Sequence, residues 1–148
     1  MKKPEENCNP FGKCEDKRIG RKPSFECSEN RKRYEYFNKS NDFIVKIRVD
    51  ECLIKGEKER KCDYLLLNCD KKTAYLIELK GGDLSHAASQ ILNVLDIFQK
   101  ELYLFEIHAR IVLSKVSQID INSEDIIKLK KRLKNRLKYQ NKVLSETF

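Results

Sequence analysis

Apolar and polar side chains alternate in the first half of the chain in a way that is typical of β-strands. Residues 42–50 (DFIVKIRVD) alternate along most of their length, which indicates a half-buried strand. Residues 62–67 and 73–79 are two short apolar runs, separated by the polar turn 68–72. Because the three strand signals are joined by short turns, they predict an antiparallel meander.

The second half of the chain predicts two helices around one further strand. Asp83 is the expected N-cap of a helix whose apolar positions recur every three to four residues between positions 84 and 102. Residues 110–116 (RIVLSKV) predict a fourth strand, and Asn122 or Ser123 caps a last helix. The apolar stripe of that helix consists of Ile126, Leu129, Leu133 and Leu137.

The segments before the meander complete the expected organisation. Residues 28–37 (SENRKRYEYF) are compatible with a helix that Ser28 caps. The order helix, three strands, helix, strand, helix predicts one α/β domain with a mixed sheet over residues 25–148. Residues 1–24 hold few apolar side chains, three prolines and many charges, so we expect them to form a basic, loosely ordered N-terminal arm.

Composition narrows the class of protein. A chain of 148 residues with a formal net charge of +8 has the size of one domain, and its charge favours a polyanionic partner. No apolar run approaches the ~20 residues that a membrane helix needs, and the charged first residues do not resemble a secretion signal. We therefore expect a cytoplasmic protein with no membrane partner, whose six cysteines are reduced. A zinc site at Cys8, Cys14 and Cys27 is an alternative that the wide spacing of the first two disfavours.

Asp63, Glu78 and Lys80 form the candidate chemical centre. Side chains alternate along a strand, so Glu78 and Lys80 share one face at the end of an apolar strand. In an antiparallel hairpin the start of one strand is level with the end of the next, which places Asp63 beside Glu78. Two crowded carboxylates repel each other, and a divalent cation that prefers oxygen ligands, Mg²⁺ or Mn²⁺, relieves the repulsion.

This pattern, Asp63 followed by Glu78-Leu79-Lys80, resembles the signature of the PD-(D/E)xK phosphodiesterase superfamily. That superfamily includes restriction endonucleases, Holliday-junction resolvases and the nuclease domains of recombination exonucleases. The resemblance covers roughly residues 28–116. It implies a restriction-endonuclease-like core of helix, three-stranded meander, helix and strand, followed here by a C-terminal basic helix. It also implies a nuclease in which Asp63, Glu78 and the Leu79 carbonyl bind Mg²⁺ or Mn²⁺ and Lys80 helps to activate water.

Further features of the superfamily have candidates in this chain. Many members carry a glutamine on the helix after the lysine, which Gln90 matches, and an acid on the first helix, for which Glu29 and Glu35 are both candidates. The chain departs from the pattern in two places. Cys62 stands where the signature has proline, and Val94 stands where the recombination exonucleases have tyrosine. The second departure argues against that branch.

Basic residues on both sides of the centre predict a nucleic-acid partner, DNA in the leading hypothesis. The segment 126–142 contains eight basic residues and no acidic one. The candidate contacts are Lys128, Lys131, Arg132 and Lys138 in that segment and Arg31, Lys32 and Arg33 in a second patch. Such residues bind the phosphate backbone with little sequence preference. A homodimer is compatible with this interpretation, since many nucleases dimerise to cut two strands.

Two other functions fit the same sequence. A non-catalytic nucleic-acid-binding protein would use the arm and the last helix, with Asp63, Glu78 and Lys80 as a structural ion network. A protein-interaction or regulatory module would owe its basic surface to solubility or to an acidic protein partner. Metal-dependent DNA cleavage that requires Glu78 and Lys80 distinguishes the nuclease from both.

Overall fold

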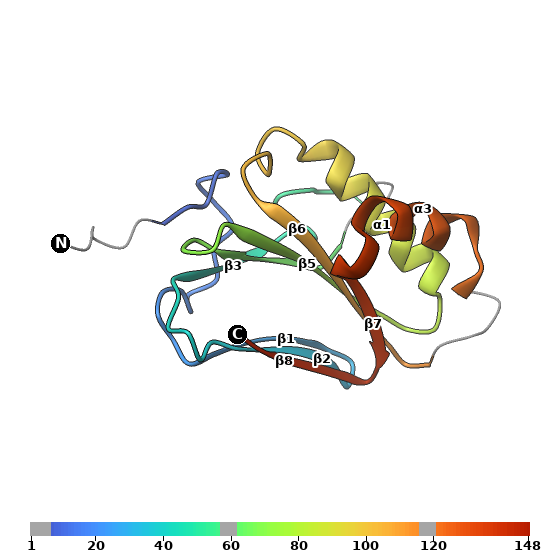
Figure 1. Ribbon diagram of the computed structural model, residues 1–148, viewed down its shortest axis with the longest axis horizontal. Helices are drawn as coiled ribbons and strands as arrows, with labels where there is room; N and C mark the ends of the chain where they lie inside the picture. Colours follow the sequence, from blue (N-terminus) through green and yellow to red (C-terminus); the bar gives the residue numbers. More distant parts are fainter. Residues whose placement is uncertain (1–6, 57–61, 116–120) are drawn as a thin grey trace.

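The computed structural model describes residues 7–56, 62–115 and 121–148, which form three layers (Figure 1). The middle layer is a five-stranded sheet with the spatial order β3 (Ile44–Arg48), β4 (Tyr64–Asn68), β5 (Thr73–Lys80), β6 (Glu106–Leu113) and β7 (Leu137–Asn141). A three-stranded sheet covers one face, in the order β1 (Ser24–Glu29), β2 (Lys32–Phe37) and β8 (Val143–Thr147). The helices α1 (Leu84–Ile97) and α3 (Glu124–Leu133) cover the other face, and a short 3-10 helix, η1 (Lys134–Arg136), follows α3.

The predicted α/β class and the mixed sheet are confirmed. β3, β4 and β5 form the predicted antiparallel meander, and β6 and β7 then add parallel to β5. The side chains of Asp83 and Ser123 cap α1 and α3 by accepting hydrogen bonds from backbone N–H groups in the first turns. Within the described ranges, neither helix has the length and apolar content to cross a membrane.

Side chains on the two faces of the central sheet pack into two separate cores. On one face, Leu65 and Leu76 pack with buried residues of α1 and α3. On the other face, Leu66 and Ile77 pack with buried aromatic residues of the small sheet. Because both faces of β4 and β5 are covered, their sequences are continuous apolar runs rather than alternating ones.

The predicted helix over residues 28–37 is wrong, because this segment contributes to strands β1 and β2. The two strands are antiparallel and are joined by Asn30 and Arg31, whose φ angles are 47° and 66°. Positive φ at both positions is the geometry of the two-residue hairpin turn that suits twisted strands. Tyr34 and Tyr36 alternate with polar residues and are 0% and 1% exposed, so burial between the two sheets outweighs the local helix signal.

The predicted C-terminal basic helix is shorter than its leucine spacing indicates. α3 ends at Leu133, and Lys134, with a φ of 55°, turns the chain away from the helix axis. The residues after η1 form β7, at one edge of the central sheet, and β8, which pairs in parallel with β2. Leu137 therefore begins a strand and is not the fourth member of a helical stripe.

Four of the six cysteines are paired, so the expectation of reduced thiols is wrong for these four. The disulfides are Cys8–Cys69 and Cys14–Cys52. Cys27 and Cys62 are free and buried. The alternative zinc site at Cys8, Cys14 and Cys27 does not fit this arrangement, because disulfide sulfurs cannot act as thiolate ligands.

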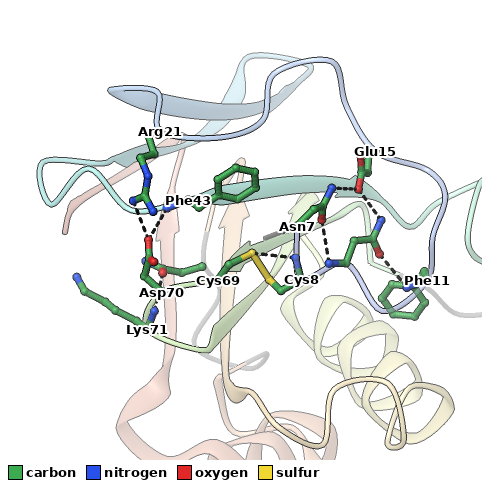
Figure 2. The surroundings of a disulfide bond; sticks show 11 residues. Asn7, Cys8, Phe11, Glu15, Arg21, Phe43, Cys69, Asp70 and Lys71 are labelled. Carbon is green, nitrogen blue, oxygen red and sulfur yellow. Dashed lines mark hydrogen bonds and ion pairs between the residues drawn. A yellow bond between two sulfur atoms is a disulfide. The ribbon is translucent and has the colours of Figure 1, made fainter. Parts of the chain in front are cut away.

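The described part of the N-terminal arm lies along the edge of the central sheet. Figure 2 shows the Cys8–Cys69 disulfide, which joins this segment to the turn after β4. Residues 14–20 then run beside β3, with backbone hydrogen bonds that include Asp16 N to Lys46 O and Gly20 N to Ile44 O, both 2.8 Å. These bonds occupy the outer edge of β3, which would otherwise present unpaired backbone groups.

A buried ion pair joins the two sheets. Arg110 on β6 is 3% exposed, and its Nε donates to the carboxylate of Glu146 on β8. Tyr34 and Lys138 donate to the same carboxylate at 2.8 Å and 2.9 Å. The C-terminal strand is therefore held in place by charge as well as by apolar contacts.

We expect Glu146→Ala to lower the free energy of unfolding by about 3 kcal/mol, because it leaves the buried Arg110 guanidinium without its charge partner. Urea unfolding followed by circular dichroism measures this loss. Glu124→Ala is the matched control, since Glu124 pairs with Lys128 on the exposed surface of α3 and such pairs contribute at most about 1 kcal/mol. Equal effects of the two substitutions would contradict the structural role of the buried pair.

Candidate active site

The candidate site lies where β4 begins and β5 ends, on the helix-covered side of the central sheet. The backbone N–H of Asp63 donates to the Ile77 carbonyl at 3.0 Å, which keeps the start of β4 bonded to β5. The Asp63 carboxylate turns onto β5 and accepts a hydrogen bond from the Leu79 N–H at 2.8 Å. The structure thus brings the Asp63 carboxyl group next to that of Glu78, and the two hydrogen-bond to each other.

Strand alternation fixes the directions of the side chains on β5. Ile77 and Leu79 belong to the core against the small sheet, so Glu78 and Lys80 point to the opposite, helix-covered face. Glu78 is 2% exposed, whereas Lys80 is half-buried at the end of the strand. Glu78 Oε1 is buried and has no hydrogen-bond partner within the described ranges.

The carboxyl pair retains one proton at neutral pH. Burial, followed by the charge and hydrogen bond of Asp63, raises the pKa of Glu78 to about 10, although the Lys80 ammonium opposes the shift. Burial also raises the pKa of Asp63, against the effect of the hydrogen bond from the Leu79 N–H. Because that N–H favours the Asp63 anion, we assign the shared proton to Glu78.

The two further acids that the sequence proposed separate in the structure, and neither lies on a helix. Glu29 ends β1, and its negative charge raises the pKa of both Asp63 and Glu78. Glu35 on β2 accepts a hydrogen bond from the Ser145 hydroxyl at 2.6 Å and lies 3.3 Å from the Arg33 guanidinium. Glu29 is thus the acid whose field reaches the site, and Glu35 belongs to the small sheet.

Gln90 lies on α1, the helix that packs over β5 and β6. It flanks the buried residues Ala87 and Val94, and its own side-chain oxygen is buried. The structure therefore places an amide in the layer that covers the helix-side face of β5.

Few groups in the site could hold a metal ion. The described residues contain no cluster of three or more histidine, cysteine, aspartate or glutamate side chains with metal-binding geometry. The available oxygen donors are the carboxyl groups of Asp63 and Glu78 and the carbonyl of Leu79. The N–H and C=O groups of a strand residue point to the same side, so the Leu79 carbonyl leaves β5 on the side of Asp63. These oxygen donors are few, they suit hard cations, and one of the two carboxyl groups carries a proton.

Most of the predicted nucleic-acid contacts have acidic or backbone partners. Lys32 is 6% exposed and donates to the Asn30 carbonyl. The other pairings are Arg33 with Glu26 and Glu35, Lys128 with Glu124, Arg132 with Asp96, and Lys138 with Glu146. Arg31 and Lys131 are exposed. The cations that the sequence singled out are thus largely neutralised in the folded protein.

Lys115 is a cation near the site that the sequence prediction did not single out. It follows β6, the strand parallel to β5, and its Cγ and Cε lie 3.8 Å from the position that a Cβ on Gly82 would occupy. Gly82 comes two residues after Lys80, so the two lysines are close to the same sheet edge. Its position two residues after the apolar run of β6 is the sequence signal that could have found it.

Comparison with known proteins identifies no relative: no family model, no curated protein and no solved structure matches this chain.

Proposed function

We propose that this protein is a metal-dependent nuclease that hydrolyses phosphodiester bonds in DNA. The observation that carries the proposal is the carboxyl pair formed by the half-buried Asp63 and the buried Glu78, with the Lys80 ammonium on the same strand as Glu78. On this proposal β3 to β6 with α1 form a restriction-endonuclease-like core, in which the hairpin β1–β2 takes the place of the first helix.

A purely structural role explains the carboxyl pair poorly. Burial of an ionisable carboxyl group costs free energy, and the raised pKa of Glu78 measures that cost. An apolar residue at position 78 would pack without the cost, as Leu76 does on the same face. Groups kept at such a cost in a partly accessible site are typical of catalytic centres.

The donor set fits a small divalent cation. Glu78 Oε1 has no hydrogen-bond partner within the described ranges, and the pair carries a proton that a cation can replace. Asp63, Glu78 and the Leu79 carbonyl would hold Mg²⁺ or Mn²⁺, whose oxygen preference they match. Such an ion neutralises charge on the phosphate and lowers the pKa of bound water.

The chain itself positions the reacting groups. The Leu79 N–H fixes the orientation of the Asp63 carboxylate at 2.8 Å. Lys80, half-buried at the end of β5, can donate a hydrogen bond that orients the attacking water or stabilises the negative charge that develops on the phosphate. Gln90 would contribute an amide from α1 at the edge of the site.

The test is cleavage of supercoiled, linear and single-stranded DNA with Mg²⁺ or Mn²⁺. We expect Glu78→Gln and Lys80→Ala each to lower the cleavage rate about 100-fold, because each removes one group that stabilises the transition state. EDTA should abolish cleavage, and the exposed Glu124→Gln should cleave at the wild-type rate. Cleavage that survives both site substitutions would falsify the mechanism.

A non-catalytic nucleic-acid-binding protein is the second candidate function. It is favoured by the absence, among the described residues, of a third carboxylate or histidine in metal-binding position. On this alternative, DNA binding is salt-sensitive, does not depend on Mg²⁺ and is unchanged in Glu78→Gln.

A further inference from the structure

A groove surrounds the edge strand β7 and extends between α3 and β8. Its volume is about 530 Å³, and its polar lining consists of Lys130, Lys134, Lys138, Tyr139 and Gln140. Among the described residues no acid lines it. The groove therefore concentrates positive charge beside an edge of the central sheet.

Two of these lysines are available to a ligand. Lys130 and Lys134 are exposed and form no ion pair with the described residues, whereas Lys138 is 2.9 Å from Glu146. Two lysines of the groove thus have no acidic partner among the described residues, whereas Lys128 and Arg132 on α3 are paired with Glu124 and Asp96. Positive charge without a counter-charge favours an anionic occupant.

The groove also contains an aromatic surface. Tyr139 is half-buried on β7, and the Lys130 Nζ lies 5.7 Å from the centre of its ring. Gln140, the next residue, is exposed and offers an amide. Lysines for phosphates together with an aromatic ring for stacking are the features by which proteins bind single-stranded nucleic acid.

A row of three lysines lies along one edge of the central sheet, between the end of the groove-lining strand β7 and the candidate active site. The strands β5, β6 and β7 are parallel, and their last residues, Lys80, Leu113 and Asn141, are in register. Lys115 follows β6, and Lys142 follows β7, where its N–H donates to the Leu113 carbonyl at 2.7 Å. Since neighbouring strands are 4.7–4.9 Å apart, β7 lies about 10 Å from β5. Ligands of α/β sheets commonly bind at the carboxyl ends of parallel strands.

We infer that this groove and the lysine row bind a single-stranded segment of nucleic acid and lead it to Asp63 and Glu78. The binding of the strand is inferred from the groove itself. Its delivery to Asp63 and Glu78 rests on the proposed nuclease function. An acidic peptide that pairs with the edge of β7 is the rival occupant. The nucleic acid is favoured because the lysine row continues to the carboxyl pair, where a peptide has no role.

The test is fluorescence anisotropy with a labelled single-stranded oligonucleotide in EDTA, with salt varied from 50 to 200 mM, about the range over which phosphate contacts weaken strongly. We expect Lys130→Glu/Lys134→Glu to weaken binding at least about 10-fold and to reduce the salt slope by about two, one unit per lysine. Tyr139→Leu should weaken single-strand binding about 10-fold through loss of stacking and leave duplex binding unchanged. The control is Lys39→Glu/Lys100→Glu, which makes the same charge change at exposed positions outside the groove. Thermal unfolding checks that each variant folds.

Three results would overturn the inference. The groove and control variants could bind alike, Tyr139→Leu could weaken duplex and single strand alike, or a polyglutamate peptide could displace the oligonucleotide from wild type at equal charge concentration. EDTA removes divalent cations, so the binding measured in this assay does not depend on a metal ion at the carboxyl pair. Groove-dependent binding without any cleavage would contradict the proposed nuclease alone, and cleavage with an unaltered rate in the groove variant would contradict the groove alone.

Discussion

Cys8→Ala/Cys69→Ala and Cys14→Ala/Cys52→Ala should each lower the free energy of unfolding by about 4 kcal/mol, since each disulfide closes a long loop in the unfolded chain. The bonded residues are 61 and 38 positions apart. Both bonds also anchor the segment that lies along β3. Urea unfolding of the two double variants and of wild type measures the loss.

Reduction provides a second measurement of the same effect. Dithiothreitol should lower the free energy of unfolding of wild type. It should not change that of a variant in which all four paired cysteines are replaced by alanine. The amide of Ile44, which donates to the Gly20 carbonyl at 3.1 Å, and that of Arg48, which donates to the Cys14 carbonyl at 3.0 Å, should then exchange hydrogen faster. A purified protein with six titratable thiols in denaturant, rather than two, would contradict the pairing.

The disulfides bear on where the protein works. Disulfides persist in oxidising compartments and are reduced in most cytoplasms. The cytoplasmic location therefore stays a prediction, and the two bonds are evidence against it. The buried Cys27 and Cys62 are different, because burial raises the pKa of both thiols and keeps them unreactive.

Glu78→Gln should make the protein more stable at pH 8 by about 3 kcal/mol, although it removes the proposed activity. The pKa of Glu78 is raised in the folded protein from its ordinary value of 4.5 to about 10. A group with a raised folded pKa contributes its full stability below pH 4.5, and this contribution is lost as the pH rises toward 10. Glutamine keeps the shape and has no proton to lose, so the gain should be small at pH 5 and large at pH 8.

Urea unfolding of wild type and Glu78→Gln at the two pH values tests this expectation. Glu35→Gln is a control of opposite sign, because the hydrogen bond from Ser145 lowers the pKa of Glu35. A group with a lowered folded pKa stabilises the protein above its ordinary pKa, so glutamine at position 35 should slightly destabilise it at pH 8. If Glu78→Gln were less stable than wild type at pH 8, the buried-proton account would be wrong.

The sequence predicts elements whose signal is local. The meander β3–β5 follows from alternation and short polar turns. The cap Asp83 follows from residue type and position, which left Asn122 and Ser123 as alternatives for the second cap, and the structure has Ser123 there. The proximity of Asp63 to Glu78 follows from hairpin geometry, because only strand direction and turn length are needed. These features require no knowledge of distant segments.

Features that depend on distant segments could not be predicted. The segment 28–37 is strand because Tyr34 and Tyr36 are buried against the central sheet and β2 pairs with β8 near the C-terminus. Leu137 matches the helical spacing of Leu129 and Leu133, yet it enters the sheet beside β6. Cysteine spacing alone does not fix which cysteines pair.

Charge was predicted from composition, which does not reveal partners. Arg132 and Asp96 are far apart in the sequence and 2.9 Å apart in the structure. The same limit hides the lysine row, because Lys80, Lys115 and Lys142 come to the same edge of the sheet only when β5, β6 and β7 align. The number of cations identifies a basic protein, and only the fold shows which of its cations lie together.

On the proposed mechanism, Asp63 and Glu78 exchange a shared proton for a divalent cation. Isothermal titration calorimetry with Mn²⁺ at pH 7, in two buffers of different ionisation enthalpy, measures the protons released per ion bound. We expect one site that releases about one proton per ion bound, and loss of that release in Glu78→Gln. Absence of binding, or binding without proton release that persists in Glu78→Gln, would contradict it.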